Sequence, residues 1–369
     1  MPTPENRDLS PCYSTISSPQ PFSNGPSPPS PPPSVERTSP EELSTASAKV
    51  VQAFRDHQDS CLDRGRLELQ LERQEYQELL GYLERDYLLR GYVNDKIRYD
   101  YDPAASLLQV RMPTPPHDLF TAKIVQEIIS RINQFSAQHT PPSALPAFLN
   151  AIENESTSDI YDYEDSTHKR SPDSAFSHPD DLFPGIVIET SYSQKAKRVE
   201  KLADEYVMMS NGSIKMVIGF DVNYPSDNGP RVDTISTWRP AHGQDQEGLF
   251  LQTETILNHE PFRNSETGTP INPNRTLVIP LSAFASDSTL INSIPLIDHT
   301  TAVVTIPFLT LAHHLEVAHE RWAQKRDSVG KMNHLATGER KRRRSSTPPD
   351  QISEGDERAW ERKERQIVH

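Results

Sequence analysis

The chain has 369 residues, of which 34% are hydrophobic and 33 are prolines, so a large part of it cannot be packed core. Its formal net charge of −14 repels phosphate backbones, and any contact with nucleic acid therefore requires a local basic patch. Cys12 and Cys61 provide neither a disulfide framework nor metal-binding spacing, which favours an intracellular location. No apolar run is long enough to cross a bilayer, so no membrane partner is expected.

The N-terminal part of the sequence changes composition near residue 40. Residues 1–40 are rich in proline and serine, which predicts a disordered arm that offers sites for protein partners. Two helices are expected next, over 41–57 and 66–90, and Gly91 is expected to end the second one. We therefore interpret residues 41–94 as a helical region.

Residues 95–327 alternate between strand-like and helical patterns, which predicts an α/β domain with a mixed sheet flanked by helices. The strand expected at 185–190, the helix at 194–210 and the strand at 214–222 form a βαβ unit with parallel strands. The other expected elements are a hairpin over 97–101 and 108–112, a helix over 118–136, strands at 159–163, 232–238, 247–257, 277–284 and 302–308, and a helix over 309–326.

Glu189 is the most informative single residue, because it follows the apolar run Ile186-Val187-Ile188. A carboxylate on a buried strand must be paired or must hold a metal ion. Asp173 lies 16 positions upstream (189 − 173), a separation that suits two adjacent strands. Carboxylate oxygens are the ligands that Mg²⁺ prefers, and a bound Mg²⁺ activates water for phosphodiester hydrolysis. Asp173 and Glu189 are therefore candidate metal ligands and catalytic residues.

Three segments around these acids carry a resemblance to a known family: Ser171–Phe176, Pro184–Gln194 and Leu202–Tyr206. Together they resemble the PD-(D/E)XK superfamily of restriction-endonuclease-like folds, in particular the putative restriction endonuclease branch and related eukaryotic proteins. The resemblance covers roughly residues 155–240. It implies a restriction-endonuclease-like fold, a Mg²⁺ cofactor and a nucleic-acid substrate, with Asp173 and Glu189 as the two acids of the motif.

The sequence departs from this superfamily at its lysine, because Ser191 stands two residues after Glu189. Lys195 lies four positions before Val199, close to the inward stripe of the helix expected at 194–210, and is the candidate replacement. Its alternative role is that of an exposed lysine. Gln194 either orients a phosphate or water, or caps the helix. Asp221 is expected to be solvated rather than a third ligand.

The polar tail after residue 328 contains five consecutive cations: Arg340, Lys341, Arg342, Arg343 and Arg344. Such a cluster indicates either a nuclear-import signal or a basic arm that contacts nucleic acid, and the alternative is a solvated charge run. The leading hypothesis is a Mg²⁺-dependent nuclease-like protein of the nucleus. The alternatives are a catalytically inactive interaction module with the same fold and a regulatory protein that acts through its arms.

Overall fold

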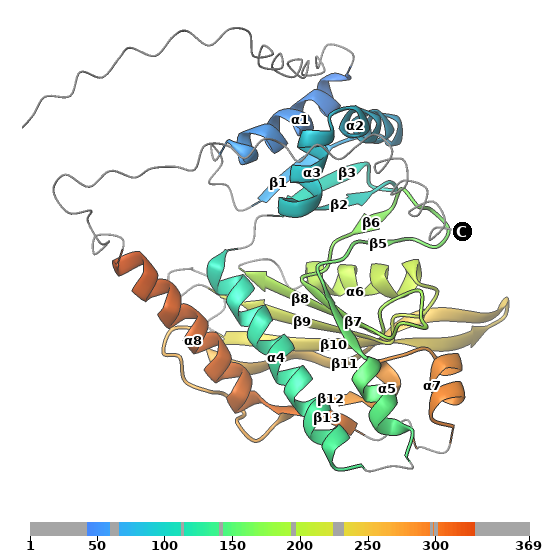
Figure 1. Ribbon diagram of the computed structural model, residues 1–369, viewed down its shortest axis with the longest axis vertical. Helices are drawn as coiled ribbons and strands as arrows, with labels where there is room; N and C mark the ends of the chain where they lie inside the picture. The colour runs from blue at the N-terminus through green and yellow to red at the C-terminus, as the bar shows by residue number, and fades with distance from the viewer. Residues whose placement is uncertain are drawn as a thin grey trace, which may run out of the picture.

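A computed structural model describes residues 43–59, 66–111, 114–139, 143–192, 197–223, 232–295, 298 and 302–328. The arm at 1–40, the pair Gln194 and Lys195, and the cluster Arg340 to Arg344 lie outside the described residues. The described part is a mixed α/β protein with eight α-helices (Figure 1). None of the helices in these ranges is long and apolar enough to cross a membrane.

The N-terminal subdomain, residues 43–111, has its own hydrophobic core. Three helices pack on one end of a five-stranded sheet ordered β1-β3-β2-β6-β5 (Figure 1). Tyr76 and Tyr101 stack in this core with ring centroids 3.8 Å apart. The elements within residues 43–111 are α1 (Thr45–Gln58), β1 (Arg66–Gln70), α2 (Arg73–Arg85), α3 (Tyr87–Lys96), β2 (Arg98–Asp102) and β3 (Leu107–Arg111). Two later strands, β5 (Ile160–Tyr161) and β6 (Lys169–Arg170), complete the sheet.

The single helix expected over 66–90 is wrong. Leu67 and Leu69 alternate with polar residues, which is the period of a strand, and β1 pairs antiparallel with β3. The helical remainder divides at Asp86, whose side chain accepts a hydrogen bond from the Leu89 amide at 3.1 Å and caps α3. Gly91 lies inside α3 and does not end a helix.

The central element is a six-stranded sheet with the order β11-β10-β9-β8-β7-β4. Strands β8 and β9 run parallel and are joined by α6, which confirms the expected βαβ unit. The other neighbours are antiparallel, so the sheet is mixed. Its elements are β4 (Glu153–Ser156), β7 (Ser174–Ser177), β8 (Ile186–Tyr192), α6 (Lys197–Met209), β9 (Met216–Val222), β10 (Val232–Asp245) and β11 (Gly248–Asn264).

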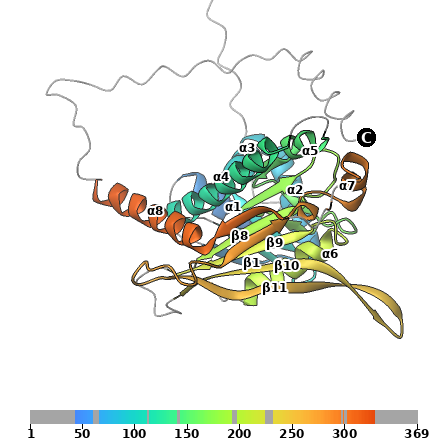
Figure 2. The same cartoon turned by 90° about the horizontal axis from the view of Figure 1, so that it is seen from below.

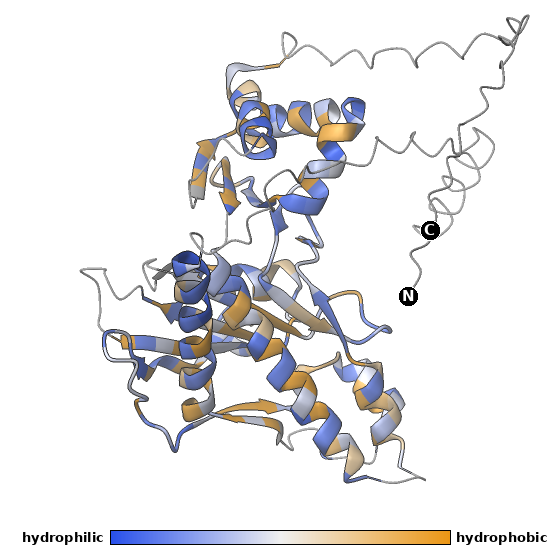
Figure 3. Cartoon of the chain, turned by 60° about the vertical axis from the view of Figure 1, so that its left-hand side comes forward, coloured by the Kyte–Doolittle hydropathy of each residue, from blue (hydrophilic) through white to orange (hydrophobic). Residues whose placement is uncertain are grey.

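Both faces of the six-stranded sheet are covered (Figure 2). Ile186 and Ile188 of β8 face the larger core, whereas Val187 faces α6. The strand is therefore apolar on both sides, as buried parallel strands are. Figure 3 shows that the long helices carry both hydrophobic and hydrophilic stripes. The larger core is completed by α4 (Pro115–Ala137), α5 (Leu145–Ala151), β12 (Thr276–Pro280), a 3₁₀ turn (Leu281–Ala283), α7 (Asp287–Ser293), β13 (Ala302–Pro307) and α8 (Phe308–Asp327).

Gly185, just before β8, lies where the backbone of the 3₁₀ turn passes. A Cβ at this position would lie 2.7 Å from the Phe284 carbonyl carbon and against the Ala283 carbonyl oxygen. Backbone atoms cannot rotate away, so Gly185→Ala should lower the free energy of unfolding by about 1–3 kcal/mol. Urea denaturation measures the change. Gly91→Ala is the control, because its Cβ meets nothing within 4 Å and alanine favours the helix by about 1 kcal/mol. Equal stability of the two variants would contradict this packing argument.

Candidate functional site

Asp173 and Glu189 lie at neighbouring positions on adjacent strands. Asp173 directly precedes β7, whose first residue, Ser174, pairs with Ile188 of β8. Both carboxylates are buried, with 7% and 3% of each residue exposed. Glu189 follows the alternation of β8 and lies on the α6 side of the sheet, where its Oε1 accepts a hydrogen bond from Tyr206 of α6.

The cation shared by these two acids is Arg111, at the end of β3 in the N-terminal subdomain. Its Nη1 donates to Glu189 Oε2 at 2.8 Å and lies 4.0 Å from Asp173 Oδ1. Its Nη2 donates to Asp100 Oδ1 at 3.0 Å and to the Ser171 carbonyl oxygen. The Arg111 guanidinium thus lies among three buried carboxylates. Asp100 belongs to the N-terminal subdomain, and Asp173 and Glu189 belong to the larger domain.

A second arginine lies directly across the hairpin, because Arg98 and Arg111 are register partners. Like charges opposite each other destabilise a sheet, so this pair requires anions nearby. Arg98 Nη1 lies 3.3 Å from Asp173 Oδ1, and its Nη2 lies 3.6 Å from Asp118 Oδ1. The acids of the larger domain therefore compensate the two arginines of the N-terminal subdomain.

His117 provides the third cation. Helix α4 begins with Pro115 and Pro116, which suit the first turn because they lack the amide hydrogen, and His117 follows them. Its Nε2 lies 3.0 Å from Asp173 Oδ2 and 2.8 Å from the Thr190 carbonyl oxygen. Although burial disfavours the charged ring, Asp173 and Asp118 raise the pKa of His117 to about 10. The imidazole is therefore a charged donor at neutral pH.

The two acids have opposite pKa shifts. Burial opposes the ionisation of Asp173, but His117, Arg111 and the Thr190 amide, 2.7 Å from Oδ2, outweigh it and hold the pKa well below its ordinary value. Burial, with the nearby charges of Asp173 and Asp100, raises the pKa of Glu189 to about 7 despite Arg111. Asp173 is consequently the anion of this site, and Glu189 releases its proton at a higher pH than an exposed glutamate does.

This donor set does not fit a divalent cation while Arg111 is in place. Asp173 Oδ1 accepts from Arg98, and Oδ2 accepts from Thr190 and His117. Glu189 Oε1 accepts from Tyr206, and Oε2 from Arg111. All four oxygens already have protein donors, and a guanidinium lies where a bridging metal ion would be. In the described ranges, no group of three His, Cys, Asp or Glu side chains could hold a metal ion.

Ser191, which stands where the sequence resemblance implies a lysine, has a hydroxyl without a hydrogen-bond partner among the described residues. Ser191 lies opposite Asp221 in the parallel register of β8 and β9. The Ser191 hydroxyl and one Asp221 oxygen are buried, and neither has a hydrogen-bond partner among the described residues. Asp221, expected to be solvated rather than a third ligand, is partly exposed, and burial together with the charge of Asp233 raises its pKa to about 6. Gln194 and Lys195 lie in the connection after β8 and outside the described residues.

The partners of the acid pair were missed by the sequence analysis. They are Arg98, Arg111, His117 and Tyr206, and Arg111 in turn donates to Asp100. A hairpin was expected here without a role for its arginines, and in the structure β3 buries Leu108 and Val110 and leaves the intervening residues partly exposed. A usable signal was present, because two arginines at the two outer ends of one hairpin are unfavourable without nearby acids. For α6, the inward stripe that includes Tyr206 is confirmed by its complete burial.

The raised pKa of Glu189 predicts a pH dependence of stability. Between about pH 4.5 and 7 the folded chain holds a proton that the unfolded chain has released, so the free energy of unfolding should fall as pH rises through this window. Glu189→Gln carries no titratable proton and should fall less steeply, as measured by urea denaturation at pH 5, 6 and 7. Glu254→Gln is the control, because Glu254 is paired on the surface with Arg239. An unchanged slope in Glu189→Gln would contradict the assignment.

The site must be interpreted from its own chemistry. In comparisons with known proteins, no family model and no curated protein matches this chain. What the geometry establishes is a buried network of three acids and three cations, centred on Arg111, at the junction of the N-terminal subdomain and the six-stranded sheet.

Proposed function

We propose that this chain is a non-catalytic interaction module built on a nuclease-like fold. The observation that carries the proposal is that the Arg111 guanidinium lies between the acids expected to hold a metal ion, 2.8 Å from Glu189 and 4.0 Å from Asp173. The site therefore carries its cation as part of the protein. Ser191, in place of a lysine, supports the same interpretation, because a hydroxyl cannot neutralise developing charge.

The energetics of the network support a structural role for the acids. Removing one partner of a buried ion pair leaves an uncompensated charge, which costs about 3–5 kcal/mol. Arg111 has three acidic neighbours, and burial alone would oppose its charge. Asp173 and Glu189 thus have a structural role as partners of Arg111 whether or not a reaction takes place. This role explains the two buried acids without catalysis.

A Mg²⁺-dependent nuclease acting on nucleic acid is the second candidate. It is favoured by the approach of Asp173 and Glu189 on adjacent strands and by the resemblance of their sequence segments to nucleases. It requires the Arg111 side chain to leave the acids, and Arg111 lines an adjacent pocket that could receive it. Restriction-endonuclease-like topology and nuclear import through Arg340 to Arg344 stay predictions of the sequence under both candidates.

Metal binding and cleavage separate the two candidates. In calorimetric titrations with Mg²⁺ and with Mn²⁺, the whole chain and its Asp173→Asn variant should give the same heats, because neither binds a metal ion at this site. Single-stranded and double-stranded DNA and RNA incubated with the whole chain should remain intact. The reason is that the carboxylate oxygens are already engaged by protein donors. Metal-dependent cleavage that disappears in Glu189→Ala would overturn the interaction-module proposal and establish the second candidate.

Removal of the Arg111 guanidinium tests whether this cation stabilises the site. Arg111→Gln leaves three buried acids without their shared partner and should lower the free energy of unfolding at pH 8 by about 3–5 kcal/mol. Arg239→Gln is the matched control, because the 57%-exposed Arg239 side chain pairs with one surface acid at 2.7 Å, a pair worth about 0–1 kcal/mol. A stable Arg111→Gln variant that gains Mg²⁺ binding in calorimetry would favour the nuclease candidate.

A further inference from the structure

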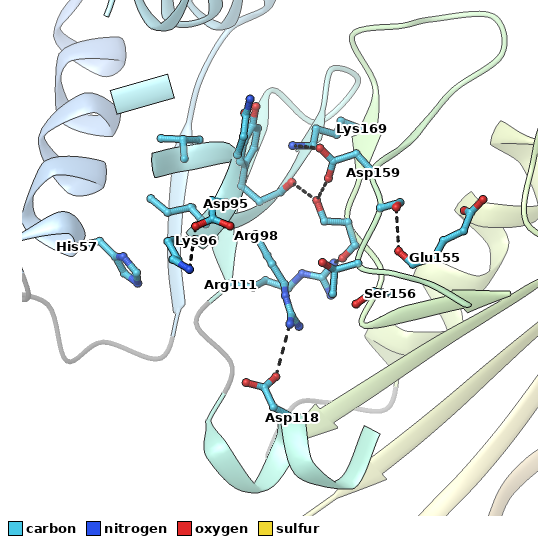
Figure 4. A pocket seen from close by; sticks show the side chains of 17 residues that line it. His57, Asp95, Lys96, Arg98, Arg111, Asp118, Glu155, Ser156, Asp159 and Lys169 are labelled. Atoms are coloured by element: carbon cyan, nitrogen blue, oxygen red, sulfur yellow. Dashed lines mark hydrogen bonds and ion pairs between the residues drawn. The ribbon is translucent and has the colours of Figure 1, made fainter. Parts of the chain in front are cut away.

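A polar pocket lies between the N-terminal subdomain and the larger domain, next to the carboxylate and arginine network (Figure 4). Its volume is about 580 Å³, within the range of small-molecule sites in proteins. The end of α3, the hairpin strands β2 and β3, the start of α4 and the segment 155–159 contribute to its wall. Arg98 and Arg111 belong both to this wall and to the network.

The charges of the pocket are arranged by depth. Its better-buried charged side chains are cationic, and its better-exposed ones are mostly acidic. The exposed fractions are 5% for Lys169, 17% for Arg111 and 26% for Arg98, against 35% for Asp159, 50% for Asp118, 58% for Lys96 and 69% for Asp95. Solvent screens charges at the rim more than charges at depth. Each of the three deeper cations already has an acidic partner, namely Asp159 for Lys169, Asp173 for Arg98 and Glu189 for Arg111. An anionic ligand can therefore enter the pocket by replacing a weakly held acid.

Arg98 is the cation best placed to bind a ligand. Its Nη2 is held by Asp118 at 3.6 Å, a loose contact with a half-exposed carboxylate. Figure 4 shows the Asp118 side chain extending from its helix toward the arginines of the hairpin. A ligand oxygen can replace Asp118 at Nη2 while Nη1 keeps its contact with Asp173. The remaining contact with Asp173 fixes the orientation of the guanidinium. A guanidinium held in this way presents its N–H donors to phosphate oxygens.

The segment 155–159 supplies hydroxyl groups in an unusual backbone conformation. Ser156, Thr157 and Ser158 line the pocket, and the Ser158 hydroxyl donates to the Glu155 carbonyl oxygen at 2.8 Å. Ser156 has a φ of 57° where the register of β4 and β7 shifts. A residue other than glycine in this region costs roughly 1–3 kcal/mol, and such strain and bulges concentrate at functional sites. Hydroxyl groups there add hydrogen-bond donors for an anion.

We propose that this pocket binds the phosphate group of a nucleotide-sized ligand. The phosphate oxygens accept hydrogen bonds from Arg98 in place of Asp118, Lys96 adds positive charge at the rim, and the hydroxyls of Ser156 and Thr157 complete the contacts. The inference goes beyond the proposed function, because it holds whether or not the acid pair is catalytic. The ligand is a free nucleotide or the terminal phosphate of an oligonucleotide, which share this chemistry.

The binding test uses the full chain and isothermal titration calorimetry. Adenosine monophosphate and uridine monophosphate should both bind, adenosine should not, and binding should weaken as salt is raised. Oligonucleotides with and without a 5′-phosphate identify the source: binding of the phosphorylated strand points to a nucleic-acid end, and binding of mononucleotides alone points to a free nucleotide. The proposal is overturned if adenosine binds as tightly as adenosine monophosphate, or if no phosphate compound binds.

Two neighbouring substitutions should act in opposite directions. Arg98→Gln should weaken binding of adenosine monophosphate roughly tenfold or more, because it removes a charge-assisted hydrogen bond. Asp118→Asn should tighten it, because it removes the competing carboxylate. Arg239→Gln, far from the pocket lining, should leave it unchanged. Unchanged affinity in both Arg98→Gln and Asp118→Asn would overturn the assignment of the site.

Because Arg98→Gln also removes a contact with buried Asp173 and can thereby affect folding, Lys96→Gln provides a second test of the pocket. Lys96 is paired only with the adjacent, exposed Asp95 among the described residues, so its removal does not disturb the buried network. It should weaken nucleotide binding with no change in melting temperature. Lys201→Gln, at a similarly exposed lysine outside the pocket, is its control. Equal affinities of the two lysine variants would count against the proposal.

Discussion

The buried contact between Arg111 and its acids is the constraint on which the rest of this molecule depends. A guanidinium loses its hydration when it is buried, and only several carboxylates at short range can compensate that loss. Arg111 obtains one from its own subdomain, Asp100, and one from the six-stranded sheet, Glu189. The two parts of the molecule, which have separate hydrophobic cores, are therefore joined by an interaction that neither part can satisfy alone.

The network also determines how each surrounding element is placed. The hairpin β2–β3 presents two arginines side by side, which is tolerable because Asp173 lies before β7 and Glu189 lies on β8. Helix α4 directs His117 at the same carboxylate that Arg98 contacts. With three acids and three cations, the group approaches neutrality despite its burial, and the proton on Glu189 adjusts the balance near pH 7.

The arrangement connects the two functional proposals. Acids engaged by arginines do not need a metal ion, and arginines held by acids at one side still offer donors at the other. Arg98 illustrates this, because one Nη atom is bound to buried Asp173 and the other only loosely to exposed Asp118. A fold of this kind can therefore retain its buried charges for stability and use the adjoining pocket for recognition of an anion.

The sequence by itself determined the local periods and the elements that follow from them. The apolar runs and the inward stripe of α6 predicted the βαβ unit, and the position of Glu189 after an apolar run predicted a buried acid that needs a partner. The strand β1 was mistaken for helix, since its pairing with β3 is nonlocal and a five-residue segment cannot reveal it. Only the tertiary structure decided what that partner is. Arg111 is 78 positions from Glu189, and periodicity describes a residue's neighbours along its own strand or helix, whereas charge pairing depends on how distant strands meet in space.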